Sequence, residues 1–116
     1  MSVNKELMKG STGTLVLTVL AKSEHYGYEI IKEIEKLSDG LFELKEGTLY
    51  PILHGLEADG FVNSRWVGKE GTRQRKYYTI TRSGRTFLKE KRDEWTKFRA
   101  AIDRIVLTRN IYQEGV

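Results

Sequence analysis

Apolar residues recur along the chain with helical spacing in four segments and with the alternation of strands in a fifth. The first segment runs from Asn4 to Lys22 and is apolar nearly all round in its second half, which predicts a buried helix. Gly10 and Gly13 weaken the helical pattern. A strand over residues 14–20 is therefore an alternative interpretation.

Residues 26–38 predict a second, amphipathic helix. Apolar side chains lie on one stripe and charged side chains fill the opposite face. Ser38, Asp39 and Gly40 then supply turn chemistry, with a glycine suited to a left-handed cap.

A third helix is expected over residues 47–59, which carry leucines and one isoleucine at i, i+3, i+4 and i+7. Gly60 closes this helix. Thr48 is the expected N-cap. Pro51 is expected in or near the first turn, where its missing N–H does least harm.

The fourth segment along the chain, between the third helix and the last one, is a β-hairpin. Residues 61–67 and 74–80 are rich in β-branched and aromatic side chains. They flank a polar loop with two glycines, residues 68–73.

The last helix, expected over residues 83–112, carries a heptad seam. Steps of three and four pass through Leu88, Lys91, Trp95, Phe98, Ile102, Ile105, Arg109 and Tyr112. A helix of this length measures ~45 Å, more than its own domain can cover. The expected dimer interface consists of Leu88, Trp95, Phe98, Ile102 and Ile105. The alternative is a helix that folds back on its own domain.

These elements predict a mostly α fold with a small β-hairpin. Their order is that of a winged helix-turn-helix, residues 1–81, followed by a C-terminal dimerisation helix, residues 82–116, in one compact unit. The third helix is then the one that enters the major groove of DNA.

The charge distribution favours a nucleic-acid partner over other partners. The chain has a net charge of +4. Residues 62–85 hold seven basic residues against one acidic residue, while the rest of the chain is slightly acidic. A basic segment on such a body is typical of a surface that binds double-stranded DNA.

Several function classes are disfavoured. The chain has no cysteine, and its two histidines, His25 and His54, fall on different helices without metal-ligand spacing. We therefore expect no metal, no cofactor and no enzymatic activity. The longest apolar run, residues 15–21, is too short to cross a bilayer, so a cytoplasmic location is expected.

Two groups of residues are candidates for DNA binding. The wing contributes cations that contact phosphates, and the third helix contributes outward polar residues near its N-terminus. The candidates are Lys45, Thr48, Tyr50, Pro51 and His54 from the helix region, and Lys69, Arg73, Arg75 and Lys76 from the wing. Tyr50 is alternatively a half-buried helix residue.

Four runs resemble the PadR family of bacterial transcriptional regulators, over about residues 7–107. They are residues 26–31 (YGYEII), 47–53 (GTLYPIL), 56–61 (LEADGF) and 75–81 (RKYYTIT). The resemblance implies a dimer that binds a palindromic operator, usually as a repressor. It also implies that Tyr28 and Tyr50 support or contact the DNA.

The short chain is similar to the compact branch of that family, which includes multidrug-sensing repressors. This similarity implies a planar aromatic ligand at Trp95, with Leu15 and Phe98 as neighbours. A packed position in the dimer seam is the alternative for Trp95.

A different class of function is a protein-interaction adaptor. The third helix lacks arginine, the side chain that most often reads guanine. In that case the winged helix would bind another protein instead of a specific DNA sequence.

Overall fold

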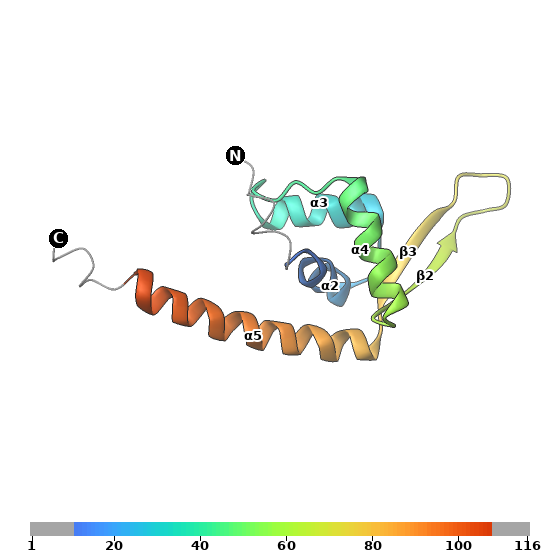
Figure 1. The fold of residues 1–116 in the computed structure, drawn as a ribbon. Helices are drawn as coiled ribbons and strands as arrows, with labels where there is room; N and C mark the ends of the chain where they lie inside the picture. The colour runs from blue at the N-terminus through green and yellow to red at the C-terminus, as the bar shows by residue number, and fades with distance from the viewer. Residues whose placement is uncertain (1–10, 108–116) are drawn as a thin grey trace.

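The computed structural model describes residues 11–107 and shows a winged helix with a long C-terminal helix, as predicted (Figure 1). The expected helical residues before Ser11 and after Leu107, Arg109 and Tyr112 included, lie outside the described residues. The elements are α2 Thr12–Lys22, β1 His25–Tyr26, α3 Gly27–Leu37, α4 Glu46–Ala58, β2 Val62–Val67, β3 Arg75–Ile80 and α5 Arg82–Val106.

Helix α2 is the centre of the core. Its side chains are buried on nearly every side because α3, α4, α5 and β3 all contact it. The strand alternative for this segment is wrong. The fully buried residues of α2 pack with leucines of α4 and with Leu88 of α5 in one cluster: Val16, Leu17, Val19, Leu20, Leu49, Leu53, Leu56 and Leu88.

The β-hairpin has a third strand that the sequence pattern did not predict. Strand β1 pairs antiparallel with β3, with His25 opposite Tyr78 and Tyr26 opposite Tyr77, so the sheet order is β1-β3-β2. Two residues are too few to show the alternation on which strand prediction depends. Strand β1 ties the start of α3 to the wing.

Helix α4 begins earlier than predicted. Lys45 is its N-cap, and Thr48 lies inside the first turn, where its amide donates to the Lys45 carbonyl at 3.0 Å. Thr48 is therefore not the cap, and Pro51 lies in the second turn. Glu46, the one residue that α4 adds before the predicted range, is exposed, so no burial pattern marked it in the sequence.

The end of α4 agrees with the turn chemistry of the sequence. Gly60 follows the C-cap of α4 with φ +78°, and the Phe61 amide donates to the Leu56 carbonyl at 2.9 Å. At the end of α3 the left-handed cap position is taken by Asp39, with φ +51°, and not by the expected glycine. Gly40 comes next, and its amide donates to the Glu35 carbonyl at 2.8 Å, so both ends satisfy terminal carbonyls.

The first turn of α5 is fixed to the base of the wing. The Thr81 hydroxyl accepts from the Gly84 amide at 3.0 Å and donates to the Gly60 carbonyl at 2.7 Å. A Cβ atom on Gly84 would collide with the Phe61 carbonyl oxygen and lie 2.8 Å from Ile80. We call this contact of Gly60 and Phe61 with Thr81 and Gly84 the α5 joint.

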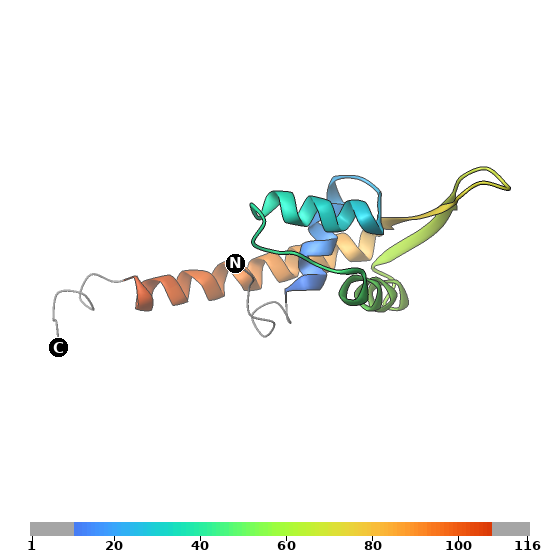
Figure 2. The same ribbon diagram turned by 90° about the horizontal axis from the view of Figure 1, so that it is seen from above.

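Beyond Leu88, α5 leaves the body of the protein (Figures 1 and 2). The exposed fractions of Trp95, Phe98, Ile102 and Ile105 are 55%, 59%, 42% and 65%. A helix that folds back on its own domain is therefore the wrong interpretation. Within residues 11–107, no helix has both the length and the hydrophobicity needed to span a bilayer.

Tyr78 is the one tyrosine of the buried core cluster, with 1% of its surface exposed. Burial raises the pKa of its phenol above the ordinary 10.0, and the Glu57 carboxylate and Tyr50 raise this pKa further. The charged phenolate is thus disfavoured in the folded protein.

Replacing Gly84 by alanine should destabilise the protein by about 3 kcal/mol, because a rigid backbone carbonyl occupies the space of the new methyl group. Gly55→Ala is the matched control. No atom lies within 4 Å of its Cβ position, so this change should stabilise α4 by roughly 0.5–1 kcal/mol. Urea unfolding followed by circular dichroism measures the change in the free energy of unfolding for each variant. Equal effects of the two substitutions would contradict the close contact at the α5 joint.

The free energy of unfolding should fall as the pH rises above 10.0, the ordinary pKa of a tyrosine such as Tyr78. The folded state holds the Tyr78 proton to higher pH than the unfolded chain does. The stabilisation that protonated Tyr78 contributes is therefore complete below its pKa in the unfolded chain. It is lost as the pH rises through its higher pKa in the folded protein. Tyr78→Phe should remove part of this alkaline loss, measured as urea midpoints between neutral and strongly alkaline pH. Tyr28→Phe, at an exposed position, is the control and should leave it in place.

Candidate nucleic-acid interface

A cleft of about 440 Å³ lies between the start of α3, helix α4 and the wing. Six of the ten predicted DNA-binding residues line it: Tyr28, Tyr50, His54, Arg73, Arg75 and Lys76. The other lining residues are Tyr26, Gly27, Glu46, Trp66, Gln74 and Tyr78. Helix and wing thus present these predicted side chains to one shared space.

The predicted residues outside the cleft are exposed beside it. Lys45, Thr48 and Pro51 are exposed on α4 and its N-cap, and Lys69 is exposed on the wing loop. The leucines of α4 point into the core. The helix therefore turns its polar N-terminal half to solvent, as a helix that enters a groove must.

Tyr50 is both packed and exposed. A Cβ atom built on Gly27 would lie 2.6 Å from the Tyr50 hydroxyl oxygen, so this phenol lies directly against the backbone at the start of α3. The exposed fraction of Tyr50 is still 37%. Glycine at position 27 leaves room for this placement, which keeps the hydroxyl at the edge of the cleft.

Tyr28 extends the cleft along α3. Its side chain is exposed, and the Lys32 ammonium lies 5.5 Å from its ring centre. A cation over a ring face fixes the ring without burying it. Tyr28 thus presents its ring and hydroxyl beside an additional positive charge.

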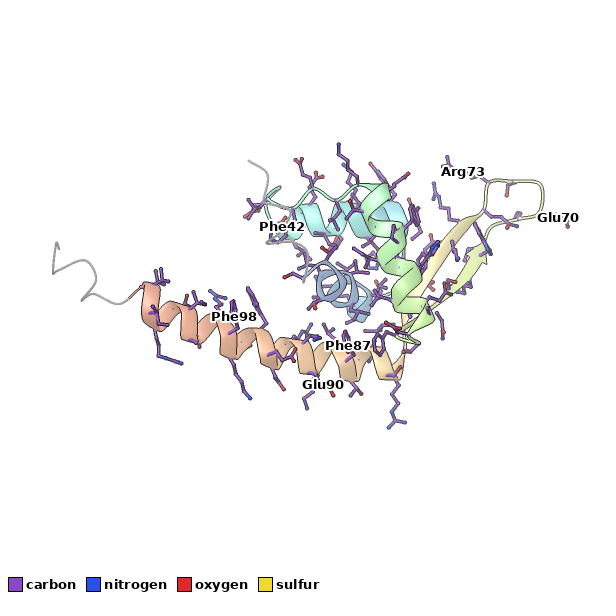
Figure 3. All side chains as sticks on the ribbon, viewed as in Figure 1. Phe42, Glu70, Arg73, Phe87, Glu90 and Phe98 are labelled. Atoms are coloured by element: carbon purple, nitrogen blue, oxygen red, sulfur yellow. The ribbon has the colours of Figure 1, made fainter. Side chains whose placement is uncertain are left out.

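The tip of the wing is an ordered turn. Gly71 has φ +82°, and the Thr72 amide donates to the Lys69 carbonyl at 3.0 Å. Glycine suits the third position of such a turn because that position needs a positive φ. Figure 3 shows Arg73 and Glu70 projecting from opposite parts of this loop.

Arg75 is supported by two aromatic rings. Its guanidinium lies 4.6 Å from the Tyr26 ring centre, and that ring contacts Tyr77 edge-on at 5.4 Å. Among the described residues, neither Arg73 nor Arg75 has an acidic side chain within 4.0 Å. These two arginines supply uncompensated positive charge to the cleft.

Two other cations of the basic segment, Arg65 and Lys76, are paired with carboxylates. The Arg65 guanidinium binds both carboxylate oxygens of Glu24, at 2.6 and 2.8 Å. The Lys76 ammonium lies 4.0 Å from a Glu57 oxygen. The local excess of basic residues in the sequence therefore overstates the positive charge available to a partner.

The sequence patterns missed two residues of this region, Trp66 and Glu57. Trp66 is 64% exposed and lies opposite Lys76 in the β2–β3 register. Glu57 accepts a hydrogen bond from the Ser64 hydroxyl at 2.5 Å. The strand register places Trp66 beside Lys76, and the packing of the end of α4 against the wing places Glu57 beside Ser64.

The acidic and histidine side chains of the described residues are spread over the surface or line the cleft singly. Within residues 11–107, no three or more His, Asp or Glu side chains are grouped to hold a metal ion. Glu46 is the one carboxylate that lines the cleft, and His54 is its one imidazole.

The fold is shared with known proteins. The family model described as the PadR-like transcriptional regulator family matches residues 16–90. A transcriptional regulator from Clostridium thermocellum superposes with a TM-score of 0.82 at 36% identity, over 88% of this chain and 99% of that one. A PadR-like transcription factor from Bacteroides fragilis gives 0.73 at 30% identity, over 86% and 94%.

A curated relative gives the same result. Transcriptional regulator Rv3488 of Mycobacterium tuberculosis is 33% identical over 88 residues, which cover 76% of this chain and 78% of the relative. The family consists of transcription factors and not of enzymes. With the fold, the paired helix and wing, and these matches in agreement, the chain belongs to the PadR-like family of transcriptional regulators.

Proposed function

We propose that this protein is a homodimeric repressor that binds a palindromic DNA operator through α4 and the wing. The observation that carries the proposal is the cleft, where Arg73 and Arg75 face the same space as Tyr28 and Tyr50. Phosphate contacts from arginine supply affinity and fix the orientation of a protein on the duplex.

In this proposal α4 enters the major groove by its N-terminal half. Thr48, Tyr50 and His54 meet base edges, while Lys45 and Pro51 lie against the groove wall. The wing follows the neighbouring minor groove, with Lys69 and Arg73 at its tip. The sugar-phosphate strand between the two grooves then lies in the cleft, against Arg75 and Tyr28.

The exposed seam of α5 supports the homodimer. Trp95, Phe98, Ile102 and Ile105 form an apolar strip that the protomer does not cover. Burial of this strip against a second copy is favourable by the hydrophobic effect. Leu88, which was predicted for the same interface, is only 3% exposed and packs in the core of its own protomer, so the strip begins after it. Two copies would place their recognition helices about 34 Å apart, one turn of DNA.

Repression would follow from the position of the operator. A dimer that covers a palindrome within a promoter excludes polymerase from the same DNA.

The implied ligand site is not assembled within one protomer. Trp95 stacks on Phe98 with ring centres 6.0 Å apart, whereas Leu15 lines a separate apolar groove with Val19, Ile34 and other residues. Packing in the dimer seam accounts for Trp95 without a ligand. Relief by a planar aromatic compound stays a prediction from the resemblance.

Arg73→Ala and Arg75→Ala should each weaken binding to all duplexes. Each should also reduce the slope of log affinity against log salt by about 0.9 for every phosphate that the variant no longer neutralises. Fluorescence anisotropy with labelled promoter fragments at several salt concentrations measures both. Lys36→Ala, at the far end of α3, is the control and should leave the slope unchanged. A folded protein that shows no specific binding at low salt would favour the adaptor interpretation.

Phe98→Glu or Ile102→Glu should convert the dimer to monomers, because each puts a charge into the apolar strip. Light scattering coupled to size exclusion measures the mass, and operator affinity should fall with it. Lys97→Glu changes an exposed position of the same helix and should remain dimeric. A monomeric wild type would refute the role of α5.

A further inference from the structure

We propose that Glu57 and Lys76 form a bracket that sets the angle of the wing against α4, so that Lys76 is a positioning residue and not a phosphate contact. The inference rests on the proposed function, since DNA binding is the property that the wing angle controls. It gives Lys76 a different role from the one that its place in the basic segment suggests.

The geometry starts from one carboxylate that contacts both strands of the wing. Glu57 is the next-to-last residue of α4. One of its oxygens accepts from the Ser64 hydroxyl on β2 at 2.5 Å, and the other lies 4.0 Å from the Lys76 ammonium on β3. Helix end, first strand and second strand are thereby joined by a single side chain.

The Lys76 ammonium is enclosed by further groups. It lies 5.6 Å from the ring centre of buried Tyr78 and 5.9 Å from that of Trp66. The exposed fractions of the Lys76 and Glu57 side chains are 30% and 35%. A partly enclosed ion pair is screened less by salt than an exposed one. The lysine is thus directed toward the helix end, unlike Arg73 at the outer loop.

The wing needs such an attachment. The α5 joint holds the hairpin at its base, and β1 pairs with β3 only at Tyr77 and Tyr78. From Lys76 outward the wing is a two-stranded hairpin, which is marginally stable by itself. The Ser64 and Lys76 contacts hold its middle against α4. Rotation of the hairpin about its base would break both contacts with Glu57, so they select one angle.

The bracket and a simple charge argument predict opposite effects of one substitution. Glu57→Gln removes a negative charge near the DNA surface, which by electrostatics alone should strengthen binding to phosphates. If Glu57 positions the wing, the same change should weaken operator binding by about 2- to 5-fold, the range expected when a partly exposed ion pair is lost. Glu43→Gln, at an exposed position before α4, is the matched control.

The salt dependence separates the two roles of Lys76. Lys76→Met keeps the apolar stem, so it should lower operator affinity without changing the salt slope. Arg73→Ala, measured beside it, should reduce the slope by about 0.9. The double variant Glu57→Gln with Lys76→Met should bind no more weakly than either single variant, because both remove the same contact. Stronger binding by Glu57→Gln, or a slope change for Lys76→Met equal to that of Arg73→Ala, would overturn the proposal.

A measurement without DNA tests the bracket directly. Protein labelled with 5-fluorotryptophan gives a ¹⁹F signal for Trp66, assigned with Trp66→Phe. Glu57→Gln should move this signal toward its position in Lys76→Met, because the unpaired lysine leaves the ring, and Glu43→Gln should not. A Trp66 signal unchanged by Glu57→Gln would reject the bracket. Failure of the wild type to bind DNA would contradict the proposed function. The ¹⁹F spectrum would still show whether Glu57 holds Lys76 against Trp66.

Discussion

The contact between Gly84 and the Phe61 carbonyl fixes the direction in which α5 leaves the domain. Thr81 closes the same joint with hydrogen bonds to both Gly60 and Gly84, and the Phe61 and Phe87 rings stack beside it at 4.3 Å. Because Gly60 ends α4 and Phe61 begins the wing, one small contact orients three elements. In the proposed dimer it therefore governs the separation of the two recognition helices.

Long segments could be predicted from the sequence because their buried positions are apolar and recur at the period of a helix or a strand. The three predicted helices before the wing, the hairpin and the solvent-directed α5 all followed from spacing. Strand β1 did not, since its two residues show no period, and neither did the exact start of α4, since Glu46 is exposed. Thr48 was the more favourable capping residue by type, yet the helix extended past it to Lys45.

In the candidate site, too, local patterns predicted some residues, whereas contacts between distant residues could not be predicted. Composition located the basic wing, and position along the third helix located Tyr50 and His54. Which cations are paired depends on contacts between distant parts of the chain, such as Arg65 with Glu24, 41 residues apart. No count of charges along a sequence distinguishes these from Arg73 and Arg75. Glu57 was missed for this reason, as a helix-surface carboxylate by every local measure.

The polar face of α4 has a consequence for the kind of operator that suits this protein. The helix contains no arginine, lysine, asparagine or glutamine, the side chains that form paired hydrogen bonds with single bases. In the proposed complex, discrimination beyond the base contacts of Thr48, Tyr50 and His54 would then rest on how easily a given sequence bends, kinks or narrows its minor groove under the wing. Operators of such a protein would share mechanical properties, such as flexible pyrimidine–purine steps, more closely than a letter-by-letter consensus.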